Sequence, residues 1–144
     1  MKTYFETKVR LVRVQDNGLP KEVTESYIVQ AETTTEVERI AMEELAPYSN
    51  GDVHVQSTRK SNIQEIVVSD KAEDRFFRVK TVFVTVDEKS GREKKHPAFM
   101  LVNAADFKDA YDTATAALRG SMLDCDIALI TETNIVDVLH LEEQ

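Results

Sequence analysis

Apolar and charged residues alternate along the start of the chain in the manner of a β-strand with one buried face. This alternation covers residues 4–14, which are rich in β-branched and aromatic types. At Leu11–Val12 it changes phase, which we interpret as a bulge or a strong twist. Residues 16–20 read Asp-Asn-Gly-Leu-Pro, a turn sequence, and apolar residues return over 23–31. The pattern therefore predicts a β-hairpin.

A short amphipathic helix is expected directly after this hairpin. Residues 33–36 form a capping-box pattern, a hydroxyl followed three residues later by Glu, and Pro47 marks the end of the helix. Apolar residues recur at i, i+3, i+4 and i+8 on one side: Val37, Ile40, Ala41 and Leu45. Two further strands are predicted over 53–56 and 63–68, joined by a turn at 59–62.

The second half of the chain has the same order of elements. A strand over 76–86 changes phase at Phe83–Val84, a turn follows at Ser90–Gly91, and a second strand covers 98–104. The next helix is expected to have one apolar face: Phe107, Ala110, Tyr111, Ala114 and Leu118. Strands over 127–130 and 135–139 complete this half.

Residues in the two halves match when the sequence is shifted against itself. At a shift of 72 the identities in the first strand are Phe5/Phe77, Lys8/Lys80, Val12/Val84 and Val14/Val86. At a shift of 73, in the hairpin and helix, they include Gly18/Gly91, Val29/Val102, Ala41/Ala114 and Leu45/Leu118. Identities in every element, in order, favour an internal duplication over chance similarity. We expect an α+β fold of two ββαββ repeats, 1–72 and 73–144, with antiparallel sheets and one helix per repeat.

A single ββαββ unit of this length would have a marginal core, so the two repeats are expected to share one compact body. The body would end in a short acidic C-terminal tail. No apolar run is long enough to cross a bilayer, and no apolar segment follows Met1 as in a signal peptide. The only cysteine, Cys125, cannot form an internal disulfide. We therefore expect a cytoplasmic protein.

No motif in the sequence specifies a chemistry. The three histidines, His54, His96 and His140, have no metal-ligand spacing with Cys125 or with one another. Cys125 lies between two aspartates, which would raise a thiol pKa rather than activate the thiol. Nucleotide-binding glycine loops and a nucleophile-elbow serine are also missing from the sequence. We expect no cofactor and no metal, and the pattern favours a protein that is not an enzyme.

Basic residues cluster at the second hairpin turn in spite of a net charge of −8. An acidic balance opposes general binding to phosphate backbones, but a local basic patch could still contact nucleic acid. The candidate contact residues are Lys89, Arg92, Lys94, Lys95, Arg59 and Lys60. Tyr4, Phe76 and Phe77 could stack on bases, although core positions suit them better. A charged, solvated hairpin tip that blocks edge pairing is the plainer interpretation.

Three segments resemble one family of small proteins: Met1–Glu6, Asp87–Lys95 and Ala104–Lys108. That family is an uncharacterised domain of unknown function from bacteria of the gut and mouth and from their mobile elements. The resemblance spans essentially the whole chain and implies a small duplicated α+β protein of the bacterial cytoplasm. It implies no catalytic or binding residue.

Two hypotheses for function follow from the sequence. The first is a non-enzymatic binding or assembly module that uses sheet or hairpin surfaces, with itself as a homodimer or with another protein as its partner. The second is a nucleic-acid-binding accessory protein that uses the basic hairpin and the sheet surface. An enzyme of unrecognised type would need a pocket with perturbed titratable groups, which only a structure can reveal.

Overall fold

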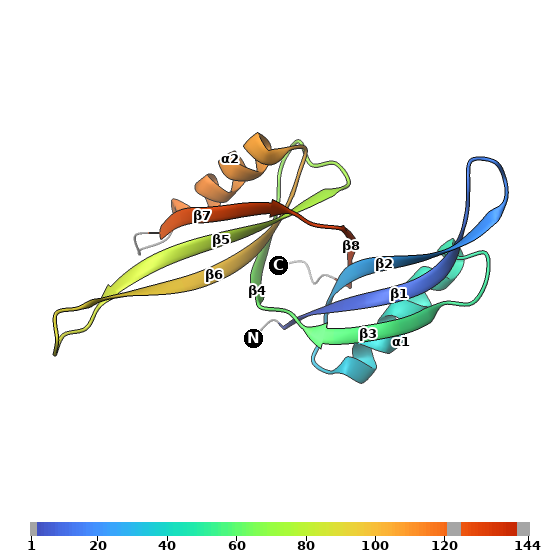
Figure 1. The fold of residues 1–144 in the computed structure, drawn as a ribbon, viewed down its shortest axis with the longest axis horizontal. Coiled ribbons are helices and arrows are strands. Elements are labelled where there is room, and N and C mark those ends of the chain that lie inside the picture. The colour runs from blue at the N-terminus through green and yellow to red at the C-terminus, as the bar shows by residue number, and fades with distance from the viewer. Residues whose placement is uncertain (1–2, 121–124, 141–144) are drawn as a thin grey trace. The chain divides into compact units, whose positions relative to one another are not determined.

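The computed structural model describes residues 3–120 and 125–140, so the expected acidic C-terminal tail lies outside the described part. The chain is an α+β protein (Figure 1). Its described elements are β1 (Tyr4–Val14), β2 (Pro20–Gln30), α1 (Thr34–Leu45), the 3-10 helix η1 (Ala46–Tyr48), β3 (His54–Lys60), β4 (Ile63–Val68), β5 (Arg75–Val86), β6 (Glu93–Ala104), α2 (Phe107–Leu118), β7 (Cys125–Glu132) and β8 (Ile135–Leu139). No described helix has the length and apolar character needed to cross a membrane.

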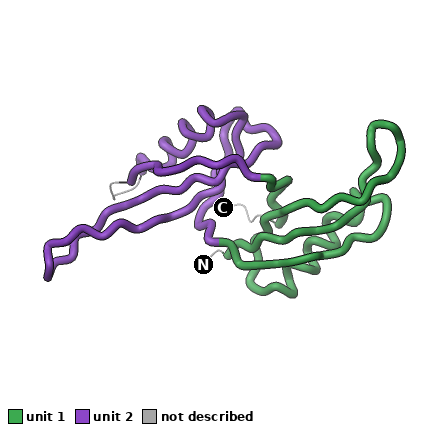
Figure 2. The backbone as a smooth tube through the Cα atoms, in the orientation of Figure 1, with its two compact units in different colours: residues 1–61, 134–144 green, residues 62–133 purple. Residues whose placement is uncertain are grey.

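The chain divides into two compact units (Figure 2). Unit 1 contains residues 1–61 and 134–144, and unit 2 contains residues 62–133. In the part of the chain that the structure describes, each unit has one four-stranded sheet and one α-helix. The strand order is β3-β1-β2-β8 in unit 1 and β4-β6-β5-β7 in unit 2.

Both sheets are mixed, which corrects the expectation of antiparallel sheets. The hairpin β1–β2 and the pair β1–β3 are antiparallel, as are β5–β6 and β5–β7. The pairs β2–β8 and β4–β6 are parallel. The reason is that β8 and β4 each enter a sheet built from the other half of the chain, so neither is placed by a hairpin.

This exchange of strands also changes the interpretation of residues 59–62. The sequence predicts a turn there that folds two strands of one sheet together. In the structure Arg59 and Lys60 belong to β3, and only Ser61 and Asn62 separate β3 in unit 1 from β4 in unit 2. Thr133 and Asn134 form the corresponding connection from β7 to β8. Each sheet is therefore completed by a strand from the other half of the sequence.

The core of unit 1 lies between its sheet and α1. Thr33 caps the helix by accepting a hydrogen bond from the Glu36 N–H, as the capping-box pattern predicts. The expected apolar stripe is buried: Val37, Ile40, Ala41 and Leu45. It packs against strand residues that include Phe5, Val9, Leu11, Tyr27 and Val29.

The core of unit 2 has smaller residues on its helix side. Of the stripe expected there, Ala110 and Ala114 are buried and Leu118 is partly buried against the core. Phe107 and Tyr111 are 49% and 51% exposed, so the prediction that they belong to the buried face is wrong. The buried positions of α2 carry alanines, which leave less side-chain volume between helix and sheet. Phe107 still meets Phe77 edge to face, at 4.9 Å between ring centroids.

The hairpin turns form as the sequence predicts, at Gly18 (φ 84°) and Gly91 (φ 69°), where residues with side chains would be strained. The ladder of β1 with β2 runs without a break from Tyr4 to Val14, so the phase change at Leu11–Val12 is not a bulge of that ladder. The register irregularity lies between β1 and β3, next to Lys8/Val9.

Candidate functional site

A groove of about 590 Å³ lies within unit 1, between the end of α1, the 3-10 helix η1 and the edge strand β8. Its volume is in the range of ligand sites in proteins. Three of its lining residues are buried: Tyr27, Leu45 and Leu139. The others are Arg13, Glu43, Glu44, Pro47, Tyr48, Val136, Asp137 and Val138. Tyr48 is 67% exposed and Val136 is 38% exposed, so the groove presents an accessible apolar rim.

One wall of the groove is fixed by a cluster of three side chains from the β1–β2 hairpin. The Arg13 guanidinium donates to Glu25 Oε1 from Nε (2.9 Å) and from Nη2 (2.7 Å). The Tyr27 hydroxyl donates to the same Glu25 oxygen and accepts from Arg13 Nη2, both at 3.2 Å. The Glu25 side chain is 16% exposed. The cluster thus holds one positive and one negative charge in mutual contact.

The environment of this cluster shifts the acid–base properties of two of its members. Burial, reinforced by the adjacent Glu25 carboxylate, raises the pKa of the Tyr27 phenol to about 12. The hydrogen bond with Glu25 raises the pKa of the Arg13 guanidinium. Tyr27 is therefore a proton-bearing donor at neutral pH and Arg13 is a cation. This arrangement suits a rigid wall rather than proton transfer.

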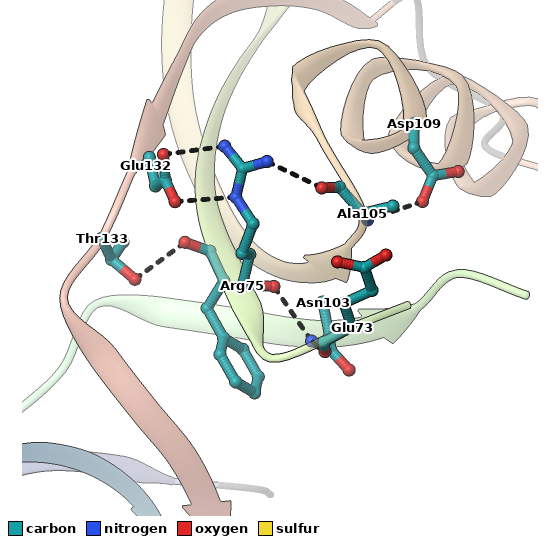
Figure 3. A network of polar contacts seen from close by, with 8 residues as sticks. Glu73, Arg75, Asn103, Ala105, Asp109, Glu132 and Thr133 are labelled. Carbon is teal, nitrogen blue, oxygen red and sulfur yellow. Dashed lines mark hydrogen bonds and ion pairs between the residues drawn. The ribbon is translucent and has the colours of Figure 1, made fainter. Parts of the chain in front are cut away.

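The polar side chains of unit 2 form a network that joins the start of β5 to α2 and β7 (Figure 3). Arg75 donates to both carboxylate oxygens of Glu132 (2.9 and 3.0 Å) and to the Ala105 carbonyl (2.8 Å). Asp109 accepts from the Ala105 N–H (2.9 Å) and from the Ser69 hydroxyl (2.7 Å). These hydrogen bonds lower the pKa of Asp109, and the bond from Arg75 lowers the pKa of Glu132.

Two further side chains drawn in Figure 3 fix the strand ends of unit 2. The Thr133 hydroxyl donates to the Phe76 carbonyl (2.9 Å), and the Asn103 amide donates to the carbonyls of Glu73 (2.7 Å) and Arg75 (2.9 Å). Both sets satisfy backbone carbonyls next to strand ends. Together with the ion pair they give the network a structural role.

A second hollow, of about 470 Å³, lies in unit 2 between the end of β4 and α2. Its lining includes Ala116 and Ala117 but no aromatic side chain. One of its carboxylates, Asp109, already accepts hydrogen bonds on both oxygens. The groove of unit 1 is therefore the stronger candidate.

The six basic candidates lie in different units. Lys89, Arg92, Lys94 and Lys95 are on the β5–β6 hairpin of unit 2, whereas Arg59 and Lys60 end β3 of unit 1. All six are exposed. Arg59 pairs with Glu6 at 2.8 Å.

The aromatic, histidine and cysteine candidates have other surroundings. Three aromatic residues that could have stacked on bases are buried: Tyr4, Phe76 and Phe77. His96 stacks on Phe83 at 4.9 Å and hydrogen-bonds Thr85 at 2.8 Å. Cys125 begins β7 and is half-buried. Within residues 3–120 and 125–140, no group of three or more His, Cys, Asp or Glu side chains is arranged to hold a metal ion.

Sequence reasoning missed the groove. The strand predicted over 23–31 contains Tyr27, but no pattern in the sequence marks Arg13 or Tyr48 as a site residue. The available signal was the hairpin register, because Arg13, Glu25 and Tyr27 share the sheet face that carries Val9 and Leu11. No local sequence pattern indicates that β8 pairs with β2 and so borders the groove.

Fold and groove together define a two-unit α+β protein in which the edge strands β8 and β4 come from the other half of the sequence and a ligand-sized groove lies in unit 1. The chain belongs to the family described as a domain of unknown function, DUF4494, whose model matches residues 3–141. No curated protein and no solved structure matches the chain.

Proposed function

We propose that this protein is a non-enzymatic binding module whose groove in unit 1 receives an extended segment of a partner protein. The observation that carries the proposal is the groove of about 590 Å³ bordered by the edge strand β8. An edge strand offers backbone donors and acceptors on one side, and a neighbouring helix can supply side-chain pockets. The exposed Tyr48 ring is the kind of anchor that dominates such interfaces.

The shifted groups support binding rather than catalysis. A general base or acid needs a free lone pair or proton directed at a substrate. Tyr27 and Glu25 bond each other and Arg13, and Asp109 bonds Ser69 and Ala105. Each of these groups therefore has a structural partner that accounts for its properties.

The test is selection of a phage-displayed library of random twelve-residue peptides on the whole chain. We expect enriched peptides whose binding falls about thirtyfold or more in Tyr48→Ala, since loss of an aromatic anchor that a ligand buries costs about 2 kcal/mol or more. The matched control is Tyr111→Ala, which removes an exposed aromatic from α2 outside both hollows. Peptides that bind Tyr48→Ala as well as the native chain would refute the groove as the binding site.

The partner can be another protein or a second copy of this chain. Homodimerisation through the groove would be visible by sedimentation as a dimer that Tyr48→Ala dissociates. We place the protein in the bacterial cytoplasm on the basis of its single cysteine and the family resemblance of its sequence.

We also propose that the two units arose by internal duplication. Equivalent features recur at shifts of 72 or 73: the N-caps Thr33 and Asp106, and the bonds from Ser61 N to Tyr4 O and from Thr133 N to Phe76 O. The strand orders correspond when β1, β2, β3 and β8 are matched to β5, β6, β7 and β4. Chance similarity would not be expected to preserve the position of the exchanged strand. Related sequences in which the identities between halves rise would support the duplication, and ones in which they vanish would oppose it.

A second candidate function is nucleic-acid binding by the β5–β6 hairpin. The observation in its favour is that Lys89, Arg92, Lys94 and Lys95 form no ion pair among the described residues. A two-stranded ribbon can enter the major groove of DNA. Against it stand the net charge of −8 and the three acidic residues in the same loop and strand: Asp87, Glu88 and Glu93.

Nucleic-acid binding by the β5–β6 hairpin can be tested by fluorescence anisotropy with labelled single- and double-stranded oligonucleotides. Binding would show a steep salt dependence and would be lost when Arg92, Lys94 and Lys95 are replaced by Glu. No binding at low salt removes nucleic acid as a partner.

A further inference from the structure

The geometry of the groove points to a cationic occupant: we propose that it binds a partner segment with a lysine or arginine next to an apolar residue. This inference rests on the proposed function and names the chemistry of the ligand for that same site. It follows from the charges in the lining, the end of α1 and the apolar rim.

The charges lining the groove are predominantly negative. Glu43, Glu44 and Asp137 line it, and among the described lining residues Arg13 is the one cation. The Arg13 guanidinium is already bound to Glu25 by two nitrogens, and Glu43 pairs with Arg39 at 3.1 Å. Neither Glu44 nor Asp137 forms an ion pair with a described residue. Two carboxylates thus remain for a cation from a ligand.

The end of α1 adds to this negative potential. The carboxyl end of a helix carries a partial negative charge, which a basic side chain in the last turn usually offsets. The last turn of α1 has no basic residue and instead contains Glu43 and Glu44. A ligand cation placed there would supply the missing favourable interaction.

The rim of the groove suits the rest of a lysine or arginine side chain. Tyr48 and Val136 are exposed large hydrophobic residues in the lining. A tyrosine ring attracts a cation over its face, and the aliphatic stem of a long basic side chain covers apolar surface. The half-buried Val138 of the lining, next to the buried Leu139, offers an apolar contact for the neighbouring residue of the ligand.

One backbone N–H of β8 is already hydrogen-bonded to a neighbouring side chain. The Asp137 carboxylate accepts a hydrogen bond from the Val138 N–H at 2.8 Å. A cation that draws this carboxylate away would release a backbone donor to the carbonyl of an incoming segment. Binding of the ligand cation by Asp137 would then favour pairing of the ligand backbone with β8, and this pairing would favour binding of the cation.

The experiment uses the whole chain and three labelled hexapeptides in which valine alternates with lysine, serine or glutamate. We expect the lysine peptide to bind at least about tenfold tighter than the serine peptide at low salt, with a smaller ratio at physiological salt. Glu44→Gln and Asp137→Asn should each reduce this ratio. Backbone NMR shifts at Tyr48 and Val136 should locate the peptide in the groove.

The control separates recognition in the groove from attraction to an acidic protein. Glu38→Gln removes the same charge from an exposed position of α1 that does not line the groove. An equal loss in Glu38→Gln and Glu44→Gln would mean general attraction and would overturn the inference. Equal affinity of the lysine and serine peptides, with shifts at Tyr48, would overturn the cation preference and leave the proposed function intact. If no peptide here or from the random library shifts groove resonances, the proposed function itself fails.

Discussion

The helices of the two units occupy equivalent places in the sequence but contact their sheets differently. In unit 1, α1 buries Val37, Ile40 and Leu45. In unit 2 the residues 73 positions later are Ala110, Thr113 and Leu118, and only Ala110 of these is fully buried. Core volume therefore comes from helix and strands in unit 1, and mostly from the strands in unit 2. The same order of strands and helix therefore forms a core with either large or small residues on the helix.

The two units also differ in where an arginine–glutamate ion pair lies. In unit 1 the ion pair of Arg13 with Glu25 lies at the wall of the groove, and both side chains hydrogen-bond the Tyr27 hydroxyl. Unit 2 has Arg75 with Glu132 where β5 begins and β7 ends, with the bond from Arg75 to Ala105 tying them to the start of α2. The Arg13–Glu25 pair contributes to the wall of an accessible groove, and the Arg75–Glu132 pair holds the start of β5 against the end of β7. The Arg13–Glu25 pair therefore borders the candidate binding groove, whereas the Arg75–Glu132 pair has a structural role.

The largest expected effect comes from cutting the chain at different places. Fragment 62–133 contains every strand of the second sheet together with α2, whereas fragment 73–144 lacks β4. We expect the first fragment to unfold cooperatively and the second to be largely unfolded, because β6 loses its parallel neighbour. Thermal unfolding followed by circular dichroism measures both.

Mixing fragments tests the exchange itself. Fragment 1–72 contains β4 and fragment 73–144 contains β8, so each has the strand that the other lacks. A mixture should regain the structure that neither has alone. Independent folding of 73–144 with the stability of 62–133 would contradict the exchange.

The sequence specifies the elements of this fold better than their partners. The turn at Gly18, the cap at Thr33 and the stripe from Val37 to Leu45 are local signals, and the structure confirms them. The exchange is not local, because Ser61 and Asn62 would read the same in a hairpin turn and in a connection between units. The groove depends on β8 and therefore could not be predicted. The alternation of apolar and polar residues identifies a strand, but it does not identify the strand with which it pairs.

A smaller effect is expected from changing core volume on the two helices. Ile40→Ala should lower the free energy of unfolding by about 2–5 kcal/mol, because Ile40 is buried and its removal leaves a cavity. Ala114→Leu should cost about 1–3 kcal/mol for the opposite reason, since Ala114 has no exposed surface. Urea unfolding measures both. A stabilising Ala114→Leu would show that unit 2 is underpacked rather than closely packed.

The next effect concerns the ion pair at the groove. Glu25→Gln should lower the free energy of unfolding by roughly 1 kcal/mol, because a charged acceptor of three donors is lost while Arg13 remains partly exposed. It should also lower the pKa of Tyr27 from about 12, since the adjacent negative charge raises it. Titration of the phenolate absorbance measures this shift. Glu132→Gln, in unit 2, should leave the Tyr27 titration unchanged, and an equal shift in both variants would contradict the assignment.

The two units should also respond to opposite ends of the pH scale. The pKa of Tyr27 is raised on folding, so its contribution to stability is present below the ordinary tyrosine value of 10.0 and is lost as the pH rises toward about 12. The pKa values of Asp109 and Glu132 are lowered on folding. Their contribution is present above the ordinary values of 3.8 and 4.5, and it is lost as the pH falls through the folded-state values.

Acid should therefore loosen unit 2 first. Hydrogen exchange of backbone amides between neutral pH and pH below about 4 should show α2 and the start of β5 losing protection before α1 does. The effect should be small, because Glu132 is exposed and Asp109 is only partly buried. Asp109→Asn should remove part of the acid dependence, since the amide cannot titrate, while Asp112→Asn on the same helix should not. A loss of protection that begins in α1 would mean that unit 1, not unit 2, depends on ionised carboxylates.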